Sequence, residues 1–205
     1  MSINPGVTPL LAAQSLSVVR GGRELFRDLS FAVCAGQLWQ VEGANGAGKT
    51  SLLRILCGLA RYGFEGQVQR SVPQLYLGHQ SAVKALLSPR ENLAWHVSGD
   101  GDYADAQIEA ALASVGLYGY EDVPSHTLSA GQQRRVNLAR LFLSNAALWL
   151  LDEPFTAIDK AGIEQLQTRL ESHVAVGGAV VMTSHQTLQL CCEVRVLRLS
   201  AGVPA

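Results

Sequence analysis

The stretch with the most specific chemistry is residues 43–51, GANGAGKTS, which fits the pattern G-x-x-x-x-G-K-[ST]. Its glycines let the backbone curl so that successive N–H groups point at an anion, and a helix beginning there adds its positive end. Lys49 supplies a point charge for the β- and γ-phosphates, and the hydroxyl of Thr50 is placed to ligate Mg²⁺. The pattern therefore predicts a nucleotide-phosphate site, against the alternative of a glycine-rich turn that caps a helix. The predicted site comprises Gly43, Ala44, Asn45, Gly46, Ala47, Gly48, Lys49, Thr50 and Ser51.

A second segment, LSAGQQRR at residues 128–135, places a serine and a glycine at the start of a predicted helix. A hydroxyl and free N–H groups at that position can contact an anion, although the same residues also make an ordinary N-cap. Taken alone, the segment does not decide between these interpretations. Shortly after it, the unbroken apolar run at 147–151 is typical of a strand buried on both faces of a parallel sheet, and two acids follow that run.

The predicted elements place both segments in an α/β fold. Apolar patterning at 10–19 and 25–33 predicts an antiparallel hairpin. A short strand at 38–42 runs into the glycine loop, and a helix at 49–60 leaves it, which is the context that the phosphate pattern needs. Helices then interrupt the strands. The other predicted elements are strands at 67–68, 75–77, 147–151, 179–183 and 195–199, and helices near 92, at 103–115, 132–143 and 160–174, and a short one carrying Cys191 and Cys192.

Composition narrows the range of partners and compartments. The 205 residues carry a formal net charge of −1, so no strong basic field directs the chain to nucleic acid. No run approaches eighteen apolar residues and no basic-then-apolar stretch opens the chain, so we expect neither a membrane span nor an export signal. The four cysteines are unevenly spaced and form no CxxC, which favours a reduced protein without a disulfide framework or a zinc site.

In this order, the glycine loop, LSAGQ and LLDEP resemble the ATP-binding cassette (ABC) family, with Ala130 in place of the first glycine of the LSGGQ signature. The resemblance covers nearly the whole chain. It implies a P-loop NTPase fold of the ABC type: a parallel-sheet core, an N-terminal antiparallel β-subdomain and an inserted α-helical subdomain at about 81–146, in one domain over 1–205. It also implies ATP and Mg²⁺ as ligands, and a head-to-tail dimer with a second copy of the chain. The signature residues expected to contact the partner's ATP are Ser129, Ala130, Gly131 and Gln132.

The same resemblance implies roles for single residues. Asp152 would hold Mg²⁺ through water, and Glu153 would polarise the attacking water as general base. Gln80 matches the Q-loop glutamine, which senses Mg²⁺ or water and faces the membrane partner. Asp159 belongs to the D-loop, and His185 matches the switch histidine that contacts the γ-phosphate.

One position departs from the family pattern. Where the family stacks adenine on an aromatic residue, this chain has Arg20. A guanidinium plane can also stack on a base, so Arg20 is a candidate adenine contact and the nucleotide selectivity stays open.

The remaining histidines and the cysteines are expected to be structural. We expect His96, His126 and His173 to be surface or packing residues, and we leave His79, beside the Q-loop glutamine, unassigned. Cys191 and Cys192 are adjacent and cannot readily bridge to each other, so we expect them to be packing residues.

Four segments narrow the resemblance further. Residues 76–92, 128–144, 148–159 and 180–186 together resemble the ATP-binding subunits of cytochrome c biogenesis (haem-exporter) complexes. This implies the membrane subunits CcmB, CcmC and CcmD, release of the haem-loaded chaperone CcmE, and a peripheral place on the cytoplasmic face of the bacterial inner membrane. The alternative is the ATP-binding subunit of a different exporter. A small-molecule kinase shares only the first motif, and an ABC ATPase that acts on ribosomes or DNA would normally carry two cassettes, a long insertion or a basic face.

Overall fold

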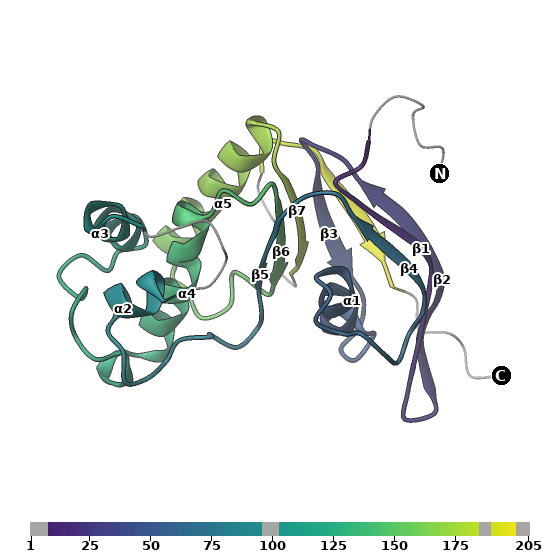
Figure 1. Cartoon of the computed structure of the whole chain (residues 1–205), viewed down its shortest axis with the longest axis horizontal. Coiled ribbons are helices and arrows are strands. Elements are labelled where there is room, and N and C mark those ends of the chain that lie inside the picture. The colour runs from purple at the N-terminus through teal and green to yellow at the C-terminus, as the bar shows by residue number, and fades with distance from the viewer. Residues whose placement is uncertain (1–7, 96–102, 185–189, 200–205) are drawn as a thin grey trace.

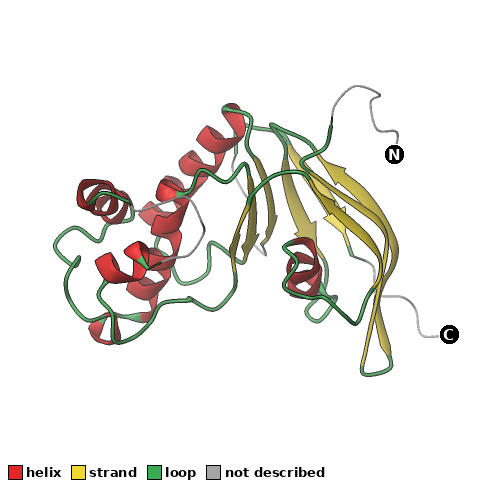
Figure 2. Ribbon diagram, viewed as in Figure 1, coloured by secondary structure: helices red, strands yellow, loops and turns green. Residues whose placement is uncertain are grey.

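The computed structural model describes residues 8–95, 103–184 and 190–199, which form two sheets and a set of helices (Figures 1 and 2). Within these residues, the larger sheet is parallel with the strand order β5-β6-β7-β3-β8, and the smaller is antiparallel with the order β2-β1-β4. The predicted α/β fold, with its N-terminal antiparallel sheet and its inserted helices, is confirmed. The strands are β1 (Leu11–Arg20), β2 (Arg23–Val33), β3 (Leu38–Glu42), β4 (Glu65–Arg70), β5 (Gln74–Leu77), β6 (Leu148–Asp152), β7 (Ala179–Thr183) and β8 (Val194–Arg198).

Helix α1 (Lys49–Leu56) packs between the two sheets (Figure 1). Its buried Leu52 and Leu56 share an apolar cluster with Leu16 of β1 and Leu150 of β6. Burial of one such leucine side chain is worth roughly 1.5–3 kcal/mol. The glycine loop at the start of α1 is therefore anchored by a helix with apolar contacts on both sides.

The other helices cover the opposite face of the parallel sheet, with α5 beside it and α2 to α4 farther out (Figure 1). Leu166 and Leu170 of α5 meet Trp149 of β6 and Leu141 of α4 in a second apolar cluster. No helix in the described part of the chain combines the length and the apolar character needed to cross a bilayer. The helices are α2 (Pro89–Ala94), α3 (Asp105–Ser114), α4 (Ala130–Leu143) and α5 (Lys160–Ala175), with a 3₁₀ turn at Ser125–Thr127.

Two sequence expectations about helices are wrong. The first helix ends at Leu56 rather than near residue 60, because Gly58 adopts a left-handed φ of 79° that breaks the helix, and Leu59 is exposed. The described residues 190–193 form bends rather than a helix, since the chain turns there directly into β8. Cys192 packs against the second apolar cluster as expected, but Cys191 is exposed.

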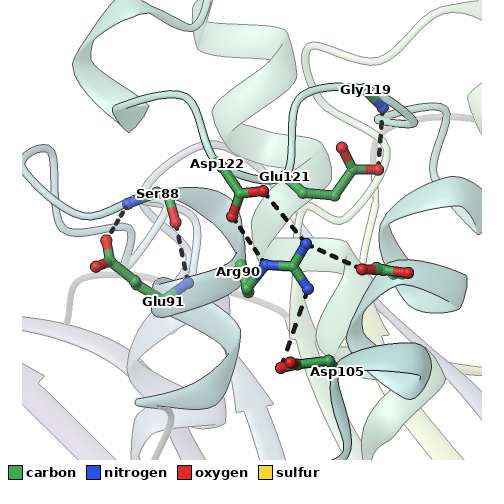
Figure 3. Close-up of polar contacts among 8 residues, drawn as sticks. Ser88, Arg90, Glu91, Asp105, Gly119, Glu121 and Asp122 are labelled. Carbon is green, nitrogen blue, oxygen red and sulfur yellow. Dashed lines mark hydrogen bonds and ion pairs between the residues drawn. The ribbon is translucent and has the colours of Figure 1, made fainter.

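Helix α2 is fixed to α3 and to the turn that follows it by Arg90 (Figure 3). The Arg90 guanidinium donates to both carboxylate oxygens of Asp122, at 2.8 and 3.3 Å, and lies 3.0 Å from Glu109. Its backbone N–H also donates to the carbonyl of Glu121 at 3.0 Å. These carboxylates raise the pKa of Arg90 and hold the three segments together. A capping box of Ser88 and Glu91 begins α2.

A stacked pair of rings fills the space between α5 and the parallel sheet. His173 lies flat on Trp149, with ring centroids 3.6 Å apart. The guanidinium carbon of Arg169 lies 4.9 Å from the centroid of the Trp149 ring. His173 is buried, as expected for a packing residue. Burial and the nearby charge of Arg169 lower the pKa of His173 to about 4.

The position of His173 predicts that stability falls in weak acid. The unfolded chain takes up a proton near pH 6.5, whereas the folded chain excludes it until about pH 4. Between these values the free energy of unfolding should fall by about 1.4 kcal/mol for each pH unit that is lost. Urea denaturation at pH 7, 6 and 5 measures the slope. His173→Gln should flatten it while His126→Gln, at an exposed histidine, should not, and equal slopes in both variants would contradict the assignment.

Candidate active site

The glycine loop connects β3 to α1, so it lies at the carboxyl end of a central strand of the parallel sheet. Gly48 is the N-cap of α1 with φ 97°. Because glycine has no side chain to cap the helix, the N–H groups at the start of α1 are left for an anion. A Cβ at Gly48 would lie 3.1 Å from Leu25 and 3.2 Å from the ring of Phe26. Packing against β2 and backbone conformation therefore both require glycine at this position.

Lys49 lies across the loop that precedes it. Its ammonium donates to the carbonyl oxygens of Gly43 at 2.8 Å and Ala44 at 3.3 Å. Residues 44–46 are exposed while Ala47 is buried, so the loop presents its first half to solvent and is anchored by the second. The arrangement places a positive charge beside a helix N-terminus, where a phosphate group would be attracted by both.

Asp152, at the end of β6, is a carboxylate with only 1% of its surface exposed. Thr50 donates to one of its oxygens at 2.8 Å, and Thr183 of β7 donates to the other at 2.7 Å. Hard oxygen donors of this kind suit Mg²⁺. In the described part of the chain, no three His, Cys, Asp or Glu side chains are grouped to hold a metal, so an ion bound here would take further ligands from phosphate and water.

The backbone N–H and carbonyl of Glu153 are both hydrogen-bonded. Its N–H donates to the Thr183 hydroxyl at 2.8 Å, and its carbonyl accepts from Arg134 at 2.7 Å. The residue has a left-handed φ of 50°, a conformation that costs a non-glycine residue of the order of 1 kcal/mol and is maintained by its surroundings. Its side chain is half-buried. Close by, burial and the charge of Asp152 raise the pKa of Tyr76 to about 12, so this phenol stays protonated.

Gln80 lies three residues beyond β5 and is exposed, as is His79. The chain on its amino-terminal side is fixed, because Arg134 donates to the carbonyl oxygens of Gly78 at 2.8 Å and His79 at 3.3 Å. On the other side, Arg140 donates to the carbonyl of Ala82 at 3.0 Å. The glutamine is therefore presented to solvent between two points that are attached to α4.

The signature residues form the N-terminus of α4. Ser129 is the N-cap, and its hydroxyl accepts from the Gln132 N–H at 3.2 Å, while Gln132 Oε1 accepts from the Ser129 N–H at 2.9 Å. Of the two interpretations of this segment, an N-cap or an anion site, the N-cap is present in the structure. Ser129 and Ala130 are also exposed, so the same N-terminus is open to a ligand from outside.

Asp159 joins the D-loop to the signature helix. Its carboxylate caps α5 by accepting from the Gly162 N–H at 2.9 Å and pairs with Arg135 of α4 at 2.6 Å. These contacts lower the pKa of Asp159. Of the other two predicted site residues, Arg20 is exposed at the turn between β1 and β2, and His185 lies outside the described residues.

The structure adds residues that the sequence reasoning missed. Thr183 connects Asp152 and Glu153, although the sequence analysis treated it only as the end of a strand. Arg134 and Arg140 are buried, although arginine is mostly an exposed residue and Arg134 stands in the polar run QQRR. The available signal for Thr183 was its place at the carboxyl end of a strand in a parallel sheet, where ligands bind.

A glycine loop between a strand and a helix, with a buried carboxylate from a neighbouring parallel strand, is typical of the P-loop nucleotide-binding class. Residues 26–156 match the model of the ABC transporter family. The cytochrome c biogenesis ATP-binding export protein CcmA of Hahella chejuensis is 51% identical over 96% of this chain and 98% of its own length. CcmA 1 of Salmonella paratyphi A is 50% identical over 94% and 98%. The chain therefore belongs to the ABC transporter family of ATP-binding, ATP-hydrolysing subunits.

A solved structure supports the same fold. The putative ABC transporter ATP-binding protein of Pyrococcus furiosus superimposes with a TM-score of 0.78 and is 25% identical, covering 92% of this chain and 96% of its own.

The contacts of Gly48 predict the result of filling it. Gly48→Ala should lower the free energy of unfolding by about 1–3 kcal/mol, because alanine is strained at this φ. Overlap of the new methyl group with Leu25 and Phe26 should lower it further by a similar amount. It should also weaken ATP binding about tenfold or more. Gly177→Ala is the matched control, because Gly177 has a similar φ of 92° but open space around it and lies away from the loop. Urea denaturation and titration with a fluorescent ATP analogue measure both effects. Equal losses in the two variants would contradict the packing argument.

Proposed function

We propose that this chain is the ATP-hydrolysing subunit of an ABC complex for cytochrome c biogenesis. The observation that carries the proposal is identity of about half of the residues with CcmA proteins along nearly the full length of both chains. In the same chain, the phosphate loop, the buried Asp152 and the base candidate Glu153 lie at adjoining positions of one sheet edge.

In this proposal each site residue has a separate role in ATP hydrolysis. The loop N–H groups and Lys49 bind the phosphates, and Thr50 with Asp152 would hold Mg²⁺. When bound, the ion neutralises charge on the phosphate oxygens. Glu153 accepts a proton from the attacking water, and its doubly held peptide keeps the carboxylate in place. Gln80 would contact Mg²⁺ or the attacking water, His185 would contact the γ-phosphate, and Arg20 would contact the adenine.

A complete site requires two copies of the chain. The N-terminus of α4 is open to solvent at Ser129 and Ala130, so it can approach an ATP held by another copy. We infer a head-to-tail dimer in which each ATP lies between one phosphate loop and the partner's signature. Residues 81–146 act as the helical subdomain that carries the signature within a single ATP-binding domain. Donors from both chains then surround the γ-phosphate in the transition state.

Similarity to CcmA export proteins supports a membrane assembly. We infer CcmB, CcmC and CcmD as partners, with the chain peripheral on the cytoplasmic face of the inner membrane and no nucleic acid involved. ATP-driven closure at the Gln80 region would be transmitted to these subunits and used to release haem-loaded CcmE.

Substitution of Glu153 should separate binding from turnover. Glu153→Gln keeps the shape of the side chain but cannot accept a proton, so ATP should still bind while hydrolysis falls by about 10²-fold or more. ATP should then trap a dimer that is visible by size-exclusion chromatography. Lys49→Ala is the contrasting variant, because it should lose ATP affinity itself. Normal turnover by Glu153→Gln would remove Glu153 from the base role.

Co-purification from membranes tests the assembly. The tagged full-length chain, extracted from its own bacterium in mild detergent, should recover proteins of the CcmB and CcmC type identified by mass spectrometry. A Lys49→Ala chain serves as the control for complexes that depend on nucleotide. Recovery with the membrane subunits of another exporter, and without CcmB- or CcmC-like proteins, would overturn the cytochrome c assignment and leave the ATPase assignment standing.

A further inference from the structure

Arg134 connects three parts of the site that are far apart in sequence. It lies in the second turn of α4, and its residue is 3% exposed. Nη1 donates to the carbonyl oxygens of Gly78 and His79 just before Gln80, at 2.8 and 3.3 Å. Nη2 donates to those of Asp152 and Glu153, at 3.1 and 2.7 Å. One guanidinium thus binds the signature helix to the ends of both β5 and β6.

The chemistry of these contacts is unusual for a buried arginine. A buried charge normally has a carboxylate partner, whereas the four hydrogen bonds of Arg134 all go to backbone carbonyls. Burial lowers the pKa of Arg134, and the charges of Asp152 and Glu153 oppose this change. A planar fork with donors on two nitrogens can reach both segments at once, which a single lysine ammonium cannot do. The contact therefore favours arginine over a generic positive charge.

Two hydrogen bonds fix the backbone of Glu153 on both sides of its Cα. The Glu153 carbonyl is bonded to Arg134 and its N–H is bonded to Thr183, on either side of a Cα with a left-handed φ of 50°. Loss of the carbonyl contact would let this strained residue relax. Because the side chain begins at that Cα, relaxation would move the carboxylate away from the attacking water. A misplacement of about 1 Å can cost on the order of 10²-fold in rate.

We propose that Arg134 is a positioning residue for ATP hydrolysis, which sets Glu153 and the approach to Gln80 according to the position of the signature helix. The inference rests on the proposed role of Glu153. Ser129 is the N-cap of α4 and Arg134 lies in its second turn. Contact of the signature with the partner's ATP therefore acts through the same helix on the peptide of Glu153 in the chain's own site. Turnover is then coupled to closure of the dimer.

The test is Arg134→Lys in the full chain, with Arg134→Gln as a second variant that is neutral and still donates to a carbonyl. We expect kcat for ATP hydrolysis to fall about 10–100-fold, with KM for ATP within about threefold of the parent. Arg169→Lys is the matched control. Arg169 also donates from two nitrogens to a backbone carbonyl, that of Leu141, but away from the site, so its variant should lose stability and keep kcat.

A second measurement separates positioning from a merely structural role. In the Glu153→Gln background the base is already absent, so adding Arg134→Lys should leave the ATP-trapped dimer intact by size-exclusion chromatography. Parental kcat in both Arg134 variants overturns the inference. So does a fall in kcat accompanied by loss of ATP affinity and of the trapped dimer, because that pattern belongs to a misfolded site. Normal hydrolysis by Glu153→Gln alone would instead overturn the proposed role of Glu153, which keeps the two failures distinct.

Discussion

The buried carboxylate of Asp152 is the constraint on which the rest of the site depends. A carboxylate removed from water needs hydrogen-bond partners, and two hydroxyls, from Thr50 and Thr183, supply them. Asp152 and Thr183 end the neighbouring strands β6 and β7, and Thr50 lies in the first turn of α1, which the glycine loop connects to β3. In the sheet register Asp152 pairs with Thr183, and Thr183 pairs with Val41 of β3, so the three strand ends lie level. Because a slip of one residue would turn the side chains to the other face, the parallel register itself builds the site.

From this edge, the order of the site extends into the helices through backbone carbonyls. Backbone carbonyl groups lie at the ends of β5 and β6, and buried polar groups of this kind need partners. Helix α4 satisfies them with Arg134, and its Arg140 reaches the far side of the Gln80 loop at Ala82. The inserted helices are therefore attached to the candidate site by directional hydrogen bonds as well as by apolar packing.

Much of the fold, and the segments that meet at the candidate site, could be predicted from the sequence, because their signals are local. A strand, a glycine loop and a helix follow each other within some twenty residues, and the parallel strands are continuous apolar runs. The early end of α1 was missed although Gly58 marks it. The burial of Arg134 could not be predicted from the residues next to it in the sequence. Its neighbour Arg135 lies about 100° around the helix and pairs with Asp159 near the surface, so two adjacent arginines of one run meet opposite environments that only the tertiary structure defines.

A tertiary contact, rather than the local pattern, also explains which of the two glycine positions in the signature is occupied by glycine in this chain. The chain keeps only the second glycine of the family's pair and has Ala130 in place of the first. Ala130 is exposed, so its methyl group has room. A Cβ on Gly131 would lie 2.9 Å from the carbonyl oxygen of Ala157, in the D-loop. Ala157 has a left-handed φ of 62°, and the ion pair of Arg135 with Asp159 holds the same loop against α4. The glycine that is present is thus the one at which two backbones meet, because the carbonyl of Ala157 leaves no room for a side chain there.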